Sequence, residues 1–193
     1  MTLNRILSIV FLLGALGLGY MLFRSVDDVM QEEKRIAATE ARIIEKLQML
    51  RDAQTAYIAS NGEYAGNWND LKNFIENGKI WLVQRSETTT LLEYGKEEIT
   101  VTLDTLGSVN VIDSLFNERK YPNFNLENLQ VVPGSGGKEF EFFADKVERN
   151  QRQIPVFEIR DPAPINPKRR ENNKEKALRV GSRTDSSTSG NWE

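Results

Sequence analysis

The stretch Ile6–Phe23 reads ILSIVFLLGALGLGYMLF and contains eighteen residues without one charged side chain. As an α-helix it rises about 27 Å, which is just enough to cross the hydrocarbon core of a bilayer. Arg5 precedes this stretch, whereas Arg24 is followed at once by acidic residues. Because cytoplasmic flanks carry the excess of basic residues, the sequence predicts a single transmembrane signal-anchor over 6–23. The N-terminus over 1–5 is then cytoplasmic, and the remainder lies on the periplasmic side of the inner (cytoplasmic) membrane.

Two other interpretations of this stretch stay open. A cleaved signal peptide has an apolar core of about 7–15 residues, which is shorter than this run, and no convincing small-residue cleavage site follows it. A buried helix of a soluble protein is the second alternative. The helical pattern continues past Arg24 without a turn signal, and this continuity favours an uncleaved anchor.

The segment 24–60 contains neither proline nor glycine and predicts a long amphipathic helix. Apolar residues recur every seven positions along one helical face. Acidic residues interrupt this stripe in its first half and give a long coiled coil little support. The stripe is the predicted packing and assembly surface, and its residues are Val29, Ile36, Ile43, Leu47, Leu50 and Tyr57. We expect one continuous rod with the membrane helix, ended by Asn61-Gly62.

The segment 61–160 predicts a small α+β head domain packed on the end of the long helix. Leu71, Phe74 and Ile75 share the face of a short helix, which Asn69 or Asp70 can cap and Gly78 ends. Strand-like alternation follows. The expected elements are strands over 80–83 and 90–94, a hairpin over 92–104 with a turn at 94–97, a further strand through Val109 and Val111, a short helix over 113–119, and two antiparallel strands around 140–143 and 154–159.

The segment 161–193 reads as a flexible tail that is first proline-rich, then basic, then rich in serine and threonine. Its basic part, Lys168–Arg179, carries six positive and two negative side chains, a net charge of +4. Trp192 is a candidate docking residue for a protein partner, because tryptophan often anchors interfaces. Alternatively, the stretch 178–182 adds an edge strand to the head or to a partner.

The composition argues against several function classes. The chain has no cysteine and no histidine, so thiolate metal sites and the commonest general base are both missing. A net charge of −3 does not favour nucleic acid. The glycine-rich loop 133–137 lacks the Lys-Ser/Thr end of a phosphate-binding loop and reads as a turn. The carboxylates nearest one another read as a solvated strand face, and they are Glu139, Glu141, Asp145 and Glu158. We therefore expect no enzyme, metal, cofactor or small-molecule substrate.

The end of the long helix and the loop after it resemble a known family. Leu50–Tyr57 reads LRDAQTAY, and it is followed by Asn61-Gly62-Glu63-Tyr64 and then by Trp68 and Leu71. Over residues 6–75 this resembles the N-terminal region of type IV pilins and type II secretion pseudopilins, in which such a helix end precedes an Asn-Gly-x-Tyr-Pro loop and a sheet head. The prepilin cleavage signature and the glutamate inside the apolar helix are missing, and Ala65 occupies the usual proline position.

These observations predict a non-enzymatic, membrane-anchored structural or assembly subunit of a cell-envelope complex, and the resemblance makes it pilin- or pseudopilin-like. Its expected partners are the membrane and proteins, including further copies of itself. A bitopic coiled-coil scaffold of a secretion or division complex is one alternative. An envelope sensor or ligand-binding module is another, with Trp68, Trp81 and nearby aromatic residues forming its site.

Overall fold

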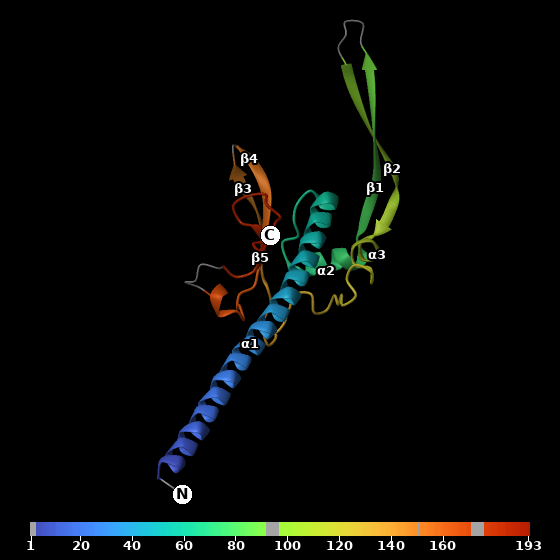
Figure 1. Ribbon diagram of the computed structural model, residues 1–193. Coiled ribbons are helices and arrows are strands. Elements are labelled where there is room, and N and C mark those ends of the chain that lie inside the picture. Colours follow the sequence, from blue (N-terminus) through green and yellow to red (C-terminus); the bar gives the residue numbers. More distant parts are fainter. Residues whose placement is uncertain (1–2, 92–96, 150, 171–175) are drawn as a thin grey trace. The chain divides into compact units, whose positions relative to one another are not determined.

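The computed structural model describes residues 3–91, 97–149, 151–170 and 176–193. The chain forms two compact units, Met1–Arg42 and Ile43–Glu193. The boundary falls inside helix α1, Leu3–Asn61, which runs for 59 residues. Antiparallel sheets follow the helices in the second unit (Figure 1), so the predicted α+β class is confirmed.

Helix α1 is uninterrupted, which confirms that the apolar stretch and the long helix form one element. Among the described residues, α1 is the one helix that is long and apolar enough to cross a membrane. The apolar side chains in its N-terminal part are exposed. The helix ends as predicted at Asn61-Gly62. Gly62 has a φ of +80°, and its N–H donates to the Ile58 carbonyl at 2.8 Å, which is the usual role of a glycine after a helix.

Helix α2, Trp68–Asn77, has the expected apolar face and the expected end at Gly78. Its cap lies earlier in the chain than predicted. The Asn67 side chain, rather than that of Asn69 or Asp70, accepts the Asp70 N–H at 2.9 Å. Trp68 already has helical geometry, so Asn67, the polar residue just before it, is the one in the capping position.

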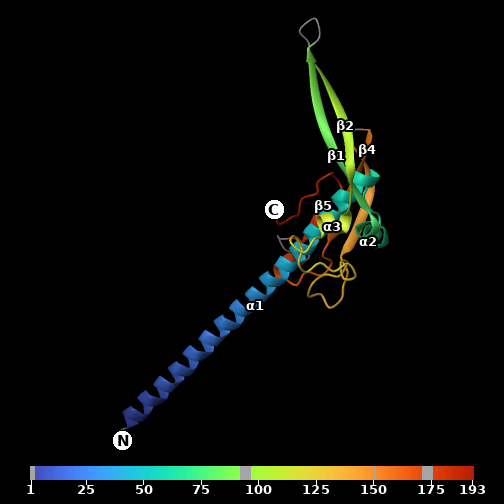
Figure 2. The ribbon, with the colours of Figure 1, turned by 90° about the vertical axis from the view of Figure 1, so that its right-hand side faces the viewer.

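Strands β1, Lys79–Leu91, and β2, Glu97–Asn110, form a two-stranded antiparallel sheet. This hairpin is longer than the predicted one, and its predicted turn falls mostly outside the described residues. A β-bulge between Leu82 and Val83 shifts the register. Val111 does not continue the strand as expected. It is fully buried at the start of helix α3, Val111–Leu115, and α3 packs next to α2 at the root of the hairpin (Figures 1 and 2).

The second sheet is antiparallel with the order β3-β4-β5. Strands β3, Glu141–Arg149, and β4, Arg152–Arg160, are the two strands predicted from the phenylalanine and isoleucine alternation. Strand β5, Arg179–Ser182, belongs to the expected tail. The flexible-tail expectation is therefore corrected for this stretch, and the alternative of an edge strand on the head is confirmed. Burial of Leu178 and Val180 explains the ordering. A 3-10 turn, Pro167–Arg169, lies between β4 and β5.

The core of the second unit forms around the C-terminal part of α1. Its apolar side chains come from α1, α2, the loop before β3, and strands β4 and β5. Fully buried members include Leu47, Leu50, Leu71, Ile75, Leu129, Phe157, Ile159 and Val180. Each such side chain contributes about 1.5–3 kcal/mol by leaving water, so α1 is a structural member of the head rather than only a stalk.

Polar contacts from α1 hold the loop between α3 and β3. Lys46 donates from Nζ to the Val131 carbonyl at 2.6 Å and also to the Asn128 carbonyl. Burial lowers the pKa of Lys46. Asp52 accepts from the Tyr121 hydroxyl at 2.9 Å, and burial followed by this hydrogen bond raises the pKa of Tyr121. Lys46 thereby binds two carbonyls of this loop, and the Asn128 carbonyl also accepts the Val131 N–H at 3.1 Å.

Candidate functional site: the exposed face of the β1–β2 hairpin

The hairpin carries an apolar surface that no described element covers. Residues paired across an antiparallel ladder point to the same face, and the face alternates along each strand. Arg85 pairs with Leu103, and Glu87 pairs with Val101. The face that contains these pairs also carries further apolar side chains. We call it the apolar hairpin face, and its apolar members are Trp81, Val83, Ile99, Val101 and Leu103. Its polar members, each paired with one of these, are Ser108, Thr105, Thr89, Glu87 and Arg85.

These apolar side chains lie in water. Trp81 is 60% exposed, Ile99 is 60% exposed and Leu103 is 67% exposed. Single exposed apolar residues are ordinary, but a contiguous group of them marks an interaction surface in a soluble domain. The apolar hairpin face is therefore the strongest candidate for a functional site in the described chain.

The opposite side of the ribbon has the reverse character. Beyond the bulge, its described side chains are polar, and we call it the polar hairpin face. It consists of Gln84, Ser86, Thr88, Thr100, Thr102 and Asp104. A ribbon with one apolar and one polar side is built to be covered on one side only. A hairpin of two strands is also marginally stable alone in water, so covering the apolar side stabilises the ribbon.

One ion pair lies on the apolar hairpin face. Arg85 Nη2 and Glu87 Oε1 are 2.6 Å apart, and both side chains are more than half exposed. They are next-nearest neighbours on β1 and so point to the same side. An exposed pair of this kind contributes about 0–1 kcal/mol to folding. The pair places one positive and one negative charge in the middle of the apolar hairpin face.

The predicted stripe on α1 divides between the two units. In the second unit Ile43, Leu47 and Leu50 are buried in the core, and Tyr57 packs edge-on against Phe74 with ring centroids 5.1 Å apart. In the first unit Val29 is 59% exposed and Ile36 is half-buried. The C-terminal half of the stripe is therefore core. Only its N-terminal part, including Val29, has the exposure that contact with another helix requires.

Trp192 does not stand free at the end of the chain. It is half-buried and packs against the core of its own unit. The neighbouring Glu193 carboxylate forms an ion pair with Arg51 of α1 at 2.5 Å. Only the exposed part of the indole is open to a partner, so its docking role stays a prediction with a smaller surface than expected.

The carboxylates singled out in the sequence separate into two groups. Glu139, Glu141 and Asp145 are exposed, as expected. Glu158 is not solvated and is only 6% exposed. Its carboxylate accepts from Arg179 at 2.5 Å and from Arg183 at 2.8 Å. The prediction for Glu158 was wrong because the sequence does not show that β5 pairs with β4. This pairing brings Arg179 of β5 to the Glu158 carboxylate.

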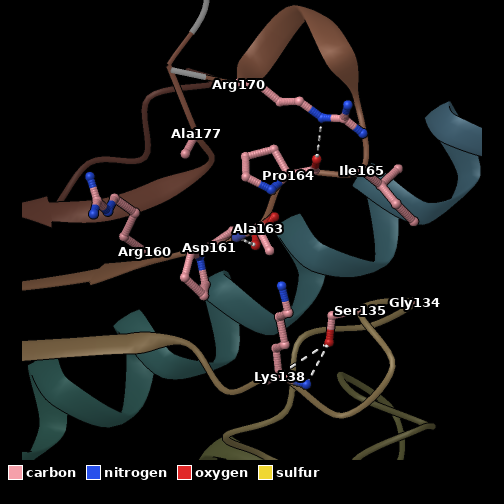
Figure 3. Close-up of a pocket in the computed structure, with 11 residues that line it drawn as sticks. Gly134, Ser135, Lys138, Arg160, Asp161, Ala163, Pro164, Ile165, Arg170 and Ala177 are labelled. Carbon is pink, nitrogen blue, oxygen red and sulfur yellow. Dashed lines mark hydrogen bonds between the residues drawn. The ribbon is translucent and has the colours of Figure 1, made fainter.

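A shallow hollow of about 630 Å³ lies between the glycine-rich loop and the proline-rich segment (Figure 3). Two of its basic groups are already engaged: Arg160 binds Glu141 at 2.7 Å, and Arg170 donates to the Pro164 carbonyl. Ser135 Oγ accepts the Lys138 N–H at 3.0 Å, so it closes the loop as a turn. This confirms the turn interpretation of 133–137.

A second hollow of about 410 Å³ is lined by Tyr57, Tyr64, Asp70 and the Glu63–Lys146 ion pair, among others. Burial raises the pKa values of both tyrosines. Lys146, by hydrogen bond and charge, lowers the pKa of Glu63. Among the residues that the structure describes, no group of three acidic side chains is placed to hold a metal ion. Neither Trp68 nor Trp81 lines either hollow.

The chain matches no protein-family model, and comparison with curated proteins and with solved structures found no match. What the structure shares with the pilin-like resemblance is the coarse architecture, a long N-terminal apolar helix followed by small antiparallel sheets. The two expected tryptophans have different neighbours. Trp68 packs against Phe142 with ring centroids 4.6 Å apart, whereas Trp81 lies on the hairpin.

The alternation of Ile99, Val101 and Leu103 predicts a strand, and the expected place of that strand was the sheet of the head. The signal for a site was present in the residues between them. Thr100, Thr102 and Asp104 make one face of the ribbon polar, which predicts one covered side. What covers that side, whether another strand of the chain or a partner, depends on tertiary contacts that no local pattern contains.

Proposed function

We propose that this protein is a non-enzymatic, membrane-anchored assembly subunit of a cell-envelope complex, pilin- or pseudopilin-like in plan, whose hairpin binds a protein partner. The observation that carries the proposal is the exposed apolar hairpin face. A surface of this kind on a ribbon that needs a partner for stability is typical of an assembly contact. Chemistry on a substrate requires polar groups in a pocket that are available to it. In the larger hollow Arg160 and Arg170 are already engaged, and in the smaller one Glu63 and Lys146 pair with each other.

The anchor supports the location. The apolar part of α1 is long enough to cross a bilayer, and none of that stretch is buried in the protein. Arg5 before it and the acidic residues after Arg24 favour a cytoplasmic N-terminus and a periplasmic head. A chain without histidine or cysteine also lacks the side chains most often used for catalysis and metal binding.

Two measurements on the full-length chain test this proposal. The first is extraction of membranes with alkaline carbonate, after which a spanning protein stays in the pellet. The second is photo-cross-linking in cells from single positions on the hairpin. Leu103 should give protein adducts and Thr102, its neighbour on the polar hairpin face, should give few. Release of the chain by carbonate overturns the anchor, and equal labelling from both positions overturns the docking face.

The same cross-linking separates the proposed subunit from a bitopic scaffold. A filament subunit gives a ladder of self-adducts, whereas a scaffold gives discrete adducts with other proteins. The sensor alternative has no support from the described hollows, because neither Trp68 nor Trp81 lines them.

A further inference from the structure

We infer that the apolar hairpin face is covered by the same face of a second copy of this chain, packed antiparallel to the first. The approximate two-fold axis crosses the ribbon at the level of the Ser86–Thr102 pair. This inference names the partner in the proposed assembly role. It rests on the proposed function, because it requires both copies to be anchored in the same membrane. Its orientation and register follow from the residues on the face.

The charges on the face are complementary to themselves in one orientation only. The level of Ser86 lies midway between Arg85 and Glu87, which point to the same side. A two-fold axis lying between the faces and perpendicular to the strands exchanges these two levels. Arg85 of each copy then lies across from Glu87 of the other, and both charges of the 2.6 Å pair gain a second partner.

The opposite orientation is unfavourable. An axis that lies between the faces and parallel to the strands keeps each level in place but exchanges the two strands, so Arg85 meets Leu103 and Glu87 meets Val101. Each charge is then covered by an apolar side chain and gains no second partner, which selects against that arrangement. The single ion pair therefore determines the direction in which two copies pack.

The same axis places the two central apolar groups against each other, while Val83 lies over Thr89 and Ile99 over Thr105. The level of Leu103 is that of Arg85, and the level of Val101 is that of Glu87. Exchange of these levels brings Leu103 of one copy over Val101 of the other. Pairing through the strand edges instead would leave the apolar hairpin face in water, so it does not account for the exposed side chains.

The contact is small. From Trp81 to Thr89, the level of Ile99, the face is nine residues long, and its eight steps cover roughly 27 Å at the rise of a strand. A ribbon two strands wide and of this length is below the area of a stable standard interface. Co-anchoring in one membrane raises the effective concentration of the copies, and this is how a contact of this size becomes populated.

Energy transfer between labelled full-length chains in phosphatidylcholine vesicles tests the inference. The chain has no cysteine, so Thr88→Cys on the polar hairpin face gives one labelling position away from the contact. Leu103→Asp should lower the apparent association by at least about tenfold, because the leucine becomes a buried charge. Thr102→Asp, one residue away on the other face, should leave association unchanged.

Charge exchange tests the orientation. Arg85→Glu makes the two central charges both negative, and Glu87→Arg makes them both positive. Each variant alone should show association reduced towards the level of Leu103→Asp. A mixture of the two should recover association, because the two central carboxylates of one copy then meet the two central arginines of the other. Association through the membrane helices alone cannot explain recovery in the mixture, because the two variants have the same membrane helix.

The outcomes separate this inference from the proposed function. If Leu103→Asp and Thr102→Asp associate equally, or if the mixture does not recover, the second copy is not the occupant of the face. The assembly role survives that result if photo-cross-linking from Leu103 in cells captures a different protein. Both fail if the face captures nothing and the chain leaves the membrane in carbonate.

Discussion

The Gln54 side chain makes both of its amide hydrogen bonds to the backbone of Ala65. Gln54 Oε1 accepts the Ala65 N–H at 2.9 Å, and Gln54 Nε2 donates to the Ala65 carbonyl at 3.2 Å. Both residues are fully buried. The contact joins α1 to the loop that follows it, and it explains why alanine occupies a position where the pilin-like resemblance has proline. Proline has no N–H and would leave Gln54 Oε1 unsatisfied.

Ala65→Pro should lower the free energy of unfolding by about 1–3 kcal/mol, the cost of one buried polar atom without a partner. The measurement is thermal or urea unfolding of the full-length chain in detergent. Gly66→Ala is the matched control, because a Cβ there meets no atom within 4 Å. Equal stability of Ala65→Pro and the parent would mean that this pair of hydrogen bonds contributes nothing net to the fold.

The two halves of the α1 stripe should respond differently to truncation. Leu47→Ala removes a fully buried side chain and should cost about 2–5 kcal/mol. Leu50→Asp places a charge in the same core and should prevent folding of the head. Val29→Ala, at an exposed position, should change stability by no more than about 0.5 kcal/mol. Denaturant unfolding in detergent measures all three, and a large loss for Val29→Ala would show that this part is also packed.

Tyr121 should make the head less stable in alkali. Burial and the hydrogen bond to Asp52 raise the folded-state pKa of Tyr121. Above about pH 10, the ordinary tyrosine value, the unfolded chain loses this proton while the folded chain keeps it. Because the folded state then binds more protons, stability falls as the pH rises. The contribution is complete below that pH and is lost through the window above it.

Tyr121→Phe separates this effect from the other tyrosines. The variant lacks the hydrogen bond to Asp52 and should be less stable than the parent by about 1 kcal/mol at neutral pH. Above about pH 10 the difference should shrink, because only the parent has this titration. Unfolding curves of both chains between neutral and alkaline pH provide the measurement, and a difference that stays constant would contradict the assignment.

Glu158 should hold strand β5 on the sheet. Glu158→Gln removes the charge that binds Arg179 and Arg183 and should cost about 1.5–3 kcal/mol, the range for hydrogen bonds to a charged group. Glu141→Gln is the matched control, since Glu141 also binds arginines but its side chain is 43% exposed. It should cost no more than about 1 kcal/mol. The rate of proteolytic cleavage near Arg179 reports release of the strand, and identical rates for both variants would exclude this role for Glu158.

Local pattern was sufficient for the elements with a strong period or a strong end signal. The helix to Asn61, the end of α2 at Gly78 and the strands around Phe142 and Ile159 follow from residue spacing and from turn residues. Prediction from local pattern failed where the structure of a position depends on a residue far away in the sequence. Val111 alternates like a strand residue but is buried as the first residue of α3, and its N–H donates at 3.0 Å to the carbonyl of Gly78, which lies before the whole hairpin.

The candidate site shows the same division. The sequence contains the alternation that makes the hairpin amphipathic, because the period of a strand is a local property. That the apolar side stays uncovered is a result of tertiary packing, since β3, β4 and β5 form a separate sheet.

The sequence by itself determined a long apolar helix, an α+β head and the absence of histidine and cysteine chemistry. Only the tertiary structure decided that Leu47 is core, that Glu158 is buried between two arginines, and that Leu103 faces water. The physical reason is that hydrophobic periodicity states which side of an element avoids water, whereas burial is a property of whichever other segment reaches that side.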